Sequence, residues 1–180
     1  MRRTAVTIFV VLCLLAIAPT AFAANVHFKG GRNAGPSFRD NGLTLSSTGA
    51  LAGLGNVDLV IKLTATGNPT GTCGNPGTNE FQAPGQNPAP VTLTGTQAIP
   101  SNQIKNGEVS FNVSTQGPVT PVPSAPDCPN RRWVERITDV AFTSATLVVE
   151  QPAGTVVLSA SCTFLTPTSN GAVPRTNVVC

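Results

Sequence analysis

The 180-residue sequence contains no tyrosine, one tryptophan and one histidine, and charged residues make up only 11% of it. Sugar-binding modules usually present a row of aromatic side chains, so this composition argues against one. A Ser-His-Asp or Cys-His site needs an imidazole that moves a proton. The one candidate, His27, lies close to the expected mature N-terminus, where catalytic geometry is hard to maintain. We therefore predict a non-enzymatic protein with no catalytic residue.

The eight acidic residues are scattered singly along the chain, which argues against carboxylate chemistry. Glycoside hydrolysis needs two carboxylates across a cleft. Glu135 and Asp139 are the nearest pair, and on a strand they would stand about 13 Å apart, so we interpret them as surface charges. No loop has the D-x-D spacing of a calcium site. Gly53-x-Gly55 precedes a strand, whereas a dinucleotide fingerprint follows one. We expect no metal and no cofactor.

The first 23 residues have the layout of an export signal. Arg2 and Arg3 precede an apolar run from Ala5 to Ala18, and Ala21-Phe22-Ala23 is a small-any-small cleavage pattern. The apolar run is shorter than the roughly 20 residues that span a bilayer. We therefore predict a cleaved signal peptide over residues 1–23 and one secreted domain over residues 24–180, with no membrane association after cleavage.

The expected mature chain is almost neutral. Without Arg2 and Arg3 the 11 basic residues become 9, against 8 acidic residues, so the net charge falls from +3 to +1. Nucleic acid is therefore not an expected partner. The mature chain is rich in glycine, proline, threonine and valine, a mixture that favours strands joined by turns.

Four of the five cysteines lie in the predicted mature chain, because Cys13 belongs to the apolar run of the signal. They are Cys73, Cys128, Cys162 and Cys180. In an oxidising compartment an even number of cysteines indicates disulfides. Zinc is the alternative, but the sequence has no Cys-x-x-Cys pair and only one histidine. We expect two disulfide bonds.

Apolar residues alternate with polar ones at a period of two, which predicts half-buried strands. The clearest segments are Val57–Thr64, Val109–Val113 and Val156–Phe164; weaker ones are Val26–Lys29, Leu43–Ser47, Val91–Gln97, Trp133–Glu150 and Asn177–Val179. In the segment from Trp133 the parity of the apolar residues changes, which predicts a β-bulge near Ser144. No segment of the mature chain has sustained helical periodicity, so we expect almost no helix.

Turn residues separate these segments. Asn41-Gly42, Asn106-Gly107 and Asn170-Gly171 favour tight hairpin turns, and Gln151–Gly154 should close another hairpin. We expect an all-β protein: an antiparallel β-sandwich of about eight or nine strands, immunoglobulin-like or of a related Greek-key type. A small β-barrel is the alternative.

Two proline-rich segments, residues 68–90 and 116–131, interrupt the pattern, and we expect no regular element in either. Loops this long in a compact domain are usually functional or tied down. Each contains one cysteine, so we favour a Cys73–Cys128 bond that staples both loops at one end of the sandwich. Cys162–Cys180 would then hold the C-terminus. Four cysteines allow three connectivities, and the sequence leaves all three open.

Three arginines flank the single tryptophan in the run Arg131, Arg132, Trp133, Arg136. If the tryptophan is exposed, this cluster would be an interaction patch. The interpretation that we favour is a core tryptophan at the start of a strand, with the arginines pointing to solvent.

Three runs carry a resemblance to known proteins: Cys73-Gly74-Asn75-Pro76-Gly77, Ala83-Pro84-Gly85-Gln86-Asn87-Pro88 and Ala125-Pro126-Asp127-Cys128-Pro129. Over residues 42–165 the chain resembles uncharacterised small secreted bacterial β-rich proteins. The resemblance implies a bacterial and secreted protein, and it implies no activity.

Loops on a rigid scaffold often carry binding functions. We therefore predict a non-enzymatic secreted or cell-surface-associated protein, extracellular or periplasmic, that contacts a protein partner through residues 68–90 and 116–133. The alternatives are a structural envelope or coat component that self-associates, and an extracellular hydrolase. The partner and the oligomeric state stay open.

Overall fold

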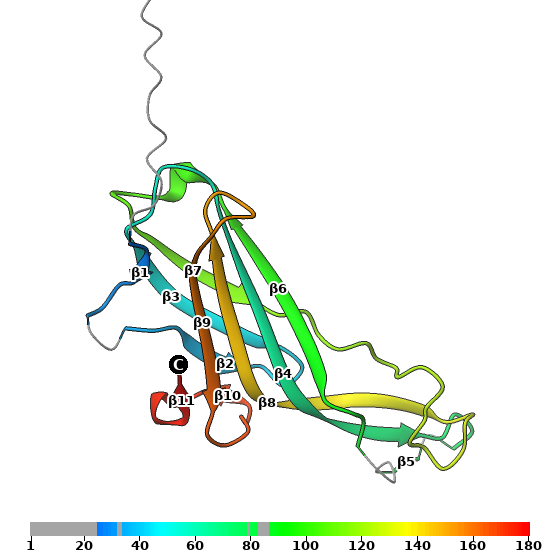
Figure 1. Cartoon of the computed structure of the whole chain (residues 1–180). Coiled ribbons are helices and arrows are strands. Elements are labelled where there is room, and N and C mark those ends of the chain that lie inside the picture. The colour runs from blue at the N-terminus through cyan, green and yellow to red at the C-terminus, as the bar shows by residue number, and fades with distance from the viewer. Residues whose placement is uncertain (1–24, 32–33, 79, 83–86) are drawn as a thin grey trace, which may run out of the picture.

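The computed structural model describes residues 25–31, 34–78, 80–82 and 87–180. The predicted signal peptide, residues 1–23, lies outside these residues. The described chain forms two antiparallel sheets packed face to face, as Figure 1 shows. Within it there is no α-helix, and two short 3-10 turns occur at η1 (Ser101–Gln103) and η2 (Arg175–Asn177). The predicted β-sandwich is confirmed.

The described chain contains eleven strands, seven of which have four residues or more. The first sheet holds β1 (His27–Phe28), β2 (Ser37–Asp40), β3 (Leu45–Ala52), β7 (Val109–Ser114) and β10 (Gly171–Ala172). The second sheet holds β4 (Leu59–Gly74), β5 (Phe81–Gln82), β6 (Val91–Ile99), β8 (Val134–Glu150), β9 (Val156–Phe164) and β11 (Val178–Val179).

The connections follow a Greek-key order. In the first sheet β3 pairs with β7 along one edge and with β1 and β2 along the other, and β10 pairs with β2. In the second sheet the order is β6-β4-β8-β9-β11, with β5 on the far end of β4. The order β2-β3-β7 facing β6-β4-β8-β9 is that of an immunoglobulin-like sandwich. The sheets do not close into a barrel, so that alternative is wrong.

Period-two alternation fills the core between the sheets. In β4 the odd-numbered residues Leu59, Ile61 and Leu63 are fully buried, while Lys62 is exposed. In β8 the parity changes where the register shifts between Thr66 and Gly67 of β4, because Thr143 is skipped in the pairing. The predicted bulge near Ser144 is therefore confirmed. Because of the bulge, alternate residues point into the core both before it, at Val140 and Phe142, and after it, at Ala145, Leu147 and Val149.

Two expectations about turns have different outcomes. Asn106 and Gly107 both have positive φ angles, 53° and 74°, between the paired residues Lys105 and Glu108, as a type I′ turn requires. Gly171 also has a positive φ, but it begins β10 and pairs with Asp40 rather than closing a hairpin. A turn-forming dipeptide shows that the chain can bend, and it does not specify which strands meet there.

The expectation that residues 68–90 contain no regular element is wrong. β4 continues to Gly74 through Pro69, and β5 pairs with its end. Proline fits here because β6 stops pairing with β4 at Gly67, so β4 is an edge strand beyond that residue. Whether a proline lies in a central or an edge strand depends on distant neighbours, which local sequence does not reveal.

The two sheets approach each other closely where β6 passes β7. A Cβ built on Gly95 of β6 would lie 1.8 Å from the carbonyl oxygen of Ser114 at the end of β7. Next to this contact the Gln116 amide donates to the Thr94 carbonyl oxygen at 2.8 Å. Only a residue without a side chain allows the two backbones to approach this closely.

Replacement of Gly95 by alanine should therefore destabilise the sandwich. Because the clash is with backbone, we expect Gly95→Ala to lower the free energy of unfolding by at least about 1–3 kcal/mol, measured by urea denaturation. Gly117→Ala is the matched control, since the nearest atom to its added Cβ is 3.9 Å away. It should change stability by less than about 0.5 kcal/mol. Equal stability of the two variants would contradict the close approach.

Candidate functional site: the disulfide-tied arm

The most distinctive feature of the molecule is a two-stranded extension of the second sheet. Residues 67–74 of β4 pair with residues 134–142 of β8, and apart from the Gly67–Val91 pair this ladder lies beyond the points where β6 and β9 stop pairing. Figure 1 shows this ribbon leaving the sandwich toward the lower right. We call the ribbon, together with residues 80–82 that pair with its end and residues 116–133 that run along it, the arm.

The loop that covers one side of the arm is attached by backbone and side-chain bonds. The Val122 amide donates to the Glu135 carbonyl oxygen at 2.8 Å, and the Ile137 amide donates to Thr120 Oγ1 at 3.2 Å. Because isolated two-stranded ribbons are marginally stable in water, these contacts and the hydrophobic cover they bring are what allow the arm to persist.

A disulfide joins the loop to the ribbon. It links Cys73 with Cys128, and a second disulfide links Cys162 with Cys180, which is the pairing favoured from the sequence. The location of the first bond differs from expectation, because Cys73 lies inside strand β4 and the bond lies on the arm rather than at an end of the sandwich. Two disulfides indicate an oxidising compartment outside the cytoplasm.

The covered side of the arm is buried and continues the core of the sandwich, to which Ile137 belongs. Cys73, Ala125 and Ile137 are each at most 6% exposed there. Glu135 is fully buried among them, and neither of its carboxylate oxygens has a hydrogen-bond partner in the described structure. Its Oε1 occupies the space beside Gly71, 3.4 Å from where a Cβ on that glycine would lie. The interpretation of Glu135 as a surface charge is wrong.

Burial raises the pKa of Glu135, because the charged form loses its hydration. The negative charge of Asp127 raises this pKa further, while the Asp127 backbone amide acts in the opposite direction. A carboxyl group with a raised pKa holds its proton in the folded state at pH values where the unfolded chain has lost it. Its ionisation therefore opposes folding as the pH rises.

A polar cluster ties the base of the arm to the sandwich. Asp40, only 2% exposed, accepts hydrogen bonds from the Gly42 amide at 2.8 Å and from Thr168 Oγ1. Thr168 in turn exchanges two hydrogen bonds with the backbone of Phe142, both 2.9 Å long. The connection after β9 and the turn after β2 thus both attach to β8 where the arm begins. Sequence reasoning missed this cluster.

Burial raises the pKa of Asp40, against the lowering effect of its bonds from Thr168 and Gly42, and the charge of Asp139 raises it further. Asp139 itself has a buried Oδ1 without a hydrogen-bond partner in the described structure. The interpretation of Asp139 as an ordinary surface charge is therefore wrong too. Thr138 is skipped in the pairing of β8 with β4. This register shift lies between Glu135 and Asp139, so their spacing is not that of two residues on a regular strand.

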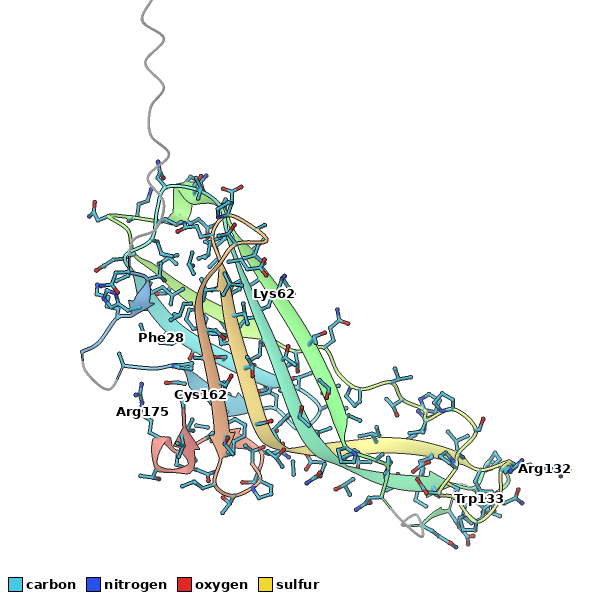
Figure 2. The ribbon with its side chains drawn as sticks, in the orientation of Figure 1. Phe28, Lys62, Arg132, Trp133, Cys162 and Arg175 are labelled. Atoms are coloured by element: carbon cyan, nitrogen blue, oxygen red, sulfur yellow. A yellow bond between two sulfur atoms is a disulfide. The ribbon has the colours of Figure 1, made fainter. Side chains whose placement is uncertain are left out.

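The arginine and tryptophan cluster lies at the far end of the arm. Figure 2 shows Arg132 and Trp133 there, remote from the sandwich. Arg131, Arg132 and Arg136 are exposed, as expected, but Trp133 is only partly buried and is not among the core residues. The expectation of a core tryptophan is wrong. The Asn130 side chain and carbonyl accept bonds from the amides of Arg132 and Trp133, at 3.0 and 2.9 Å, and hold this turn.

Apolar surface is exposed on both sides of the arm. A groove of about 550 Å³ runs between the start of β6 and the loop; its lining includes Pro88, Pro90, Pro118, Val119 and Pro123. The side chain of Val119 is 75% exposed. On the other side, Phe81 is 67% exposed and lines a smaller hollow with Val134 and Arg136. The arm therefore combines apolar side chains with arginines.

His27 lies elsewhere, exposed on β1, with Nδ1 2.8 Å from the carbonyl oxygen of Asn25. No helix in the described residues is both long and apolar enough to cross a bilayer. Comparisons with known proteins give no relative: no protein-family model, curated protein or solved structure matches the chain.

Loss of the Cys73–Cys128 bond should loosen the arm before the sandwich. In a chain-entropy model this bond, which spans 55 residues, contributes about 4 kcal/mol. The double variant Cys73→Ser/Cys128→Ser should be less stable by up to that amount, and the amides of residues 134–142 should exchange with deuterium faster. Cys162→Ser/Cys180→Ser, which opens an 18-residue span worth about 3 kcal/mol, is the control that should leave those amides protected. Unchanged exchange in the first variant would contradict this role.

Removal of the charge at Glu135 should stabilise the protein at neutral pH. Glu135→Gln keeps the shape of the protonated side chain and cannot ionise. At pH 7 the free energy of unfolding of the variant, measured by urea denaturation, should exceed that of the parent. The difference should be about 1.4 kcal/mol for each unit by which the pKa is raised. The difference should shrink as the pH falls toward the ordinary value of 4.5, because the parent carboxyl is then neutral too. Glu80→Gln, on the exposed part of the arm, is the control. A stabilisation that is the same at pH 4 and pH 7 would count against a buried ionisable group.

Proposed function

We propose that this chain is a secreted bacterial protein without enzymatic activity, and that its arm binds a protein partner at or near the cell surface. The observation that carries the proposal is the arm itself. It extends away from the sandwich, it has its own disulfide, and it exposes Val119 on one side and Phe81, beside Arg136, on the other.

The composition of this surface supports a protein partner. Aromatic residues and arginine are enriched in protein interfaces, where a few such side chains supply most of the binding energy. Exposed phenylalanine and valine lower the solubility of a free protein, and a partner that covers them would remove that disadvantage. The covering loop and its disulfide limit the disorder that binding would have to remove, which favours affinity.

The proposed location rests on two further features. The two disulfides fit an oxidising environment. The export-signal pattern of residues 1–23 supplies a route out of the cytoplasm. Nothing in this proposal needs a metal, a cofactor or a proton-transfer residue.

Saturable binding of the labelled mature protein to cells of its own species tests the proposal. The arm variant Phe81→Ser/Arg132→Ser removes one apolar and one cationic side chain, and it should weaken binding roughly tenfold or more, as for central interface residues. The control Leu165→Ser/Lys105→Ser also removes one apolar and one cationic side chain, at exposed positions outside the arm, and its binding should equal that of the parent. Equal binding by all three proteins would contradict the proposal.

A structural component that self-associates is the second candidate function. The feature that favours it is the outer edge of β9. From Val156 to Ser161 this edge pairs with no strand of the described chain.

A further inference from the structure

The two faces of the ribbon in the arm differ in how far they are covered. Cys73 and Glu135 are fully buried on the face under the covering loop. Side chains alternate between the faces of a strand, so Val134, which pairs with Gly74, lies on the opposite face. There Phe81 of β5 pairs with Gly74 from the other side. We call this side of the ribbon, together with Phe81, the outer face of the arm.

A hollow of about 310 Å³ opens on the outer face. One wall is Phe81, whose Cε1 lies 3.1 Å from where a Cβ on Gly74 would be, so the missing side chain of that glycine lets the ring approach the strand. Val134 also lines the hollow, and so does Arg136, which follows two residues later on the same face and is exposed. The hollow therefore places apolar side chains beside a cationic one.

Positive charge gathers at this end of the arm. Arg131 and Arg132 directly precede the partly buried Trp133, and both are exposed, as is Arg136. Figure 2 shows Arg132 at the far end of the arm. The two ion pairs that the described residues form both lie on the sandwich, so none of these three arginines is paired with a carboxylate of the described chain.

The acidic side chains of the arm leave this positive charge largely uncompensated. Glu135 is buried on the covered face, and Asp127 is half-buried near it, where its charge raises the pKa of Glu135. Glu80 is exposed, and its Oε2 accepts a hydrogen bond from Thr78 Oγ1 at 3.2 Å. Among the described residues of the arm, three exposed guanidinium groups therefore stand against one exposed carboxylate. This surface is complementary to a negatively charged partner.

Anionic partners differ in whether they also supply an apolar group. Polyphosphates and anionic polysaccharides carry no apolar side chain for the hollow beside Phe81. A membrane takes up apolar side chains that protrude into it, whereas a hollow receives a side chain from its partner. An acidic protein segment supplies both groups, because its carboxylates pair with guanidinium in bidentate geometry and an apolar side chain next to them can fill the hollow.

We propose that the outer face of the arm binds an acidic segment of the partner protein, with an apolar side chain in the hollow and carboxylates on Arg132 and Arg136. This inference rests on the proposed function and adds the chemistry of the partner. Complementary charges raise the rate of association and select the partner, while the apolar contact holds the complex together. Binding should therefore weaken with rising ionic strength and should also need the apolar side chain.

Titration of the mature protein with synthetic peptides tests this inference. The fluorescence of Trp133, the only tryptophan in the chain, reports binding at this end of the arm. A peptide in which glutamates flank one leucine should bind. Lysines in place of the glutamates, or glycine in place of the leucine, should weaken binding roughly tenfold or more. Salt raised from about 0.01 M to about 1 M, which shortens the Debye length from about 30 Å to about 3 Å, should weaken the first peptide most.

Two matched variants locate the binding surface. Arg132→Gln/Arg136→Gln removes two positive charges from the arm, and it should bind the glutamate and leucine peptide roughly tenfold more weakly or worse. Arg39→Gln/Lys105→Gln removes the same charge from exposed positions on the sandwich, and it should bind like the parent. Thermal unfolding of both variants checks that the fold is kept.

Four outcomes would overturn the inference: no binding of the acidic peptide, equal binding of the lysine peptide, equal binding of the glycine peptide, or an unchanged affinity in Arg132→Gln/Arg136→Gln. Inorganic polyphosphate or vesicles that contain phosphatidylglycerol would also overturn it if they bound as tightly as the acidic peptide, since the partner would then be an anionic polymer or a membrane. Binding to cells that depends on the arm, without any response to the acidic peptide, would reject this inference and retain the proposed function.

Discussion

The antiparallel pairing of β4 with β8 organises both the sandwich and the arm. Inside the sandwich it forms the centre of the second sheet, and the same two strands continue as the arm. Two register shifts along it, opposite Gly67 and Gly71, let the apolar residues of β8 stay on the buried side over its whole length. Without these shifts, the apolar side chains of β8 on one side of each shift would point to solvent.

The arm places unusual demands on polar groups. A two-stranded ribbon outside the main core has two free edges and two open faces, so each must be covered locally. Thr120, Asn87 and Val122 meet part of this demand by hydrogen bonds to the strand backbones. Glu135 shows where the cover is imperfect, since its carboxyl group is buried without a partner in the described structure. The fold therefore tolerates an ionisable group whose charge opposes folding, at the place where we propose that a partner binds.

Much of the fold could be predicted from local patterns. Alternation at a period of two identified most of the longer strands, and the change of parity in the segment from Trp133 located the bulge at the start of the arm. Strand β2 was missed, because its buried residues include Asp40, which carries no hydrophobic signal. The arm was missed because Pro69 and the two glycines between residues 68 and 74 favour a loop, and the ladder with β8 overrides that preference.

Local sequence patterns were sufficient to predict the all-β class, the number of cysteines available for disulfides and the positions of several turns. These follow from local properties: side-chain alternation, backbone restrictions at glycine and proline, and residue counts. The three-dimensional arrangement was needed to show that Cys73 lies in a strand, that Glu135 and the Oδ1 atom of Asp139 are buried, and that Trp133 lies outside the core. It was also needed to show that one edge of β9 lacks a partner strand among the described residues. Each of these depends on where neighbouring strands end, and that is set by pairing between segments far apart in the chain.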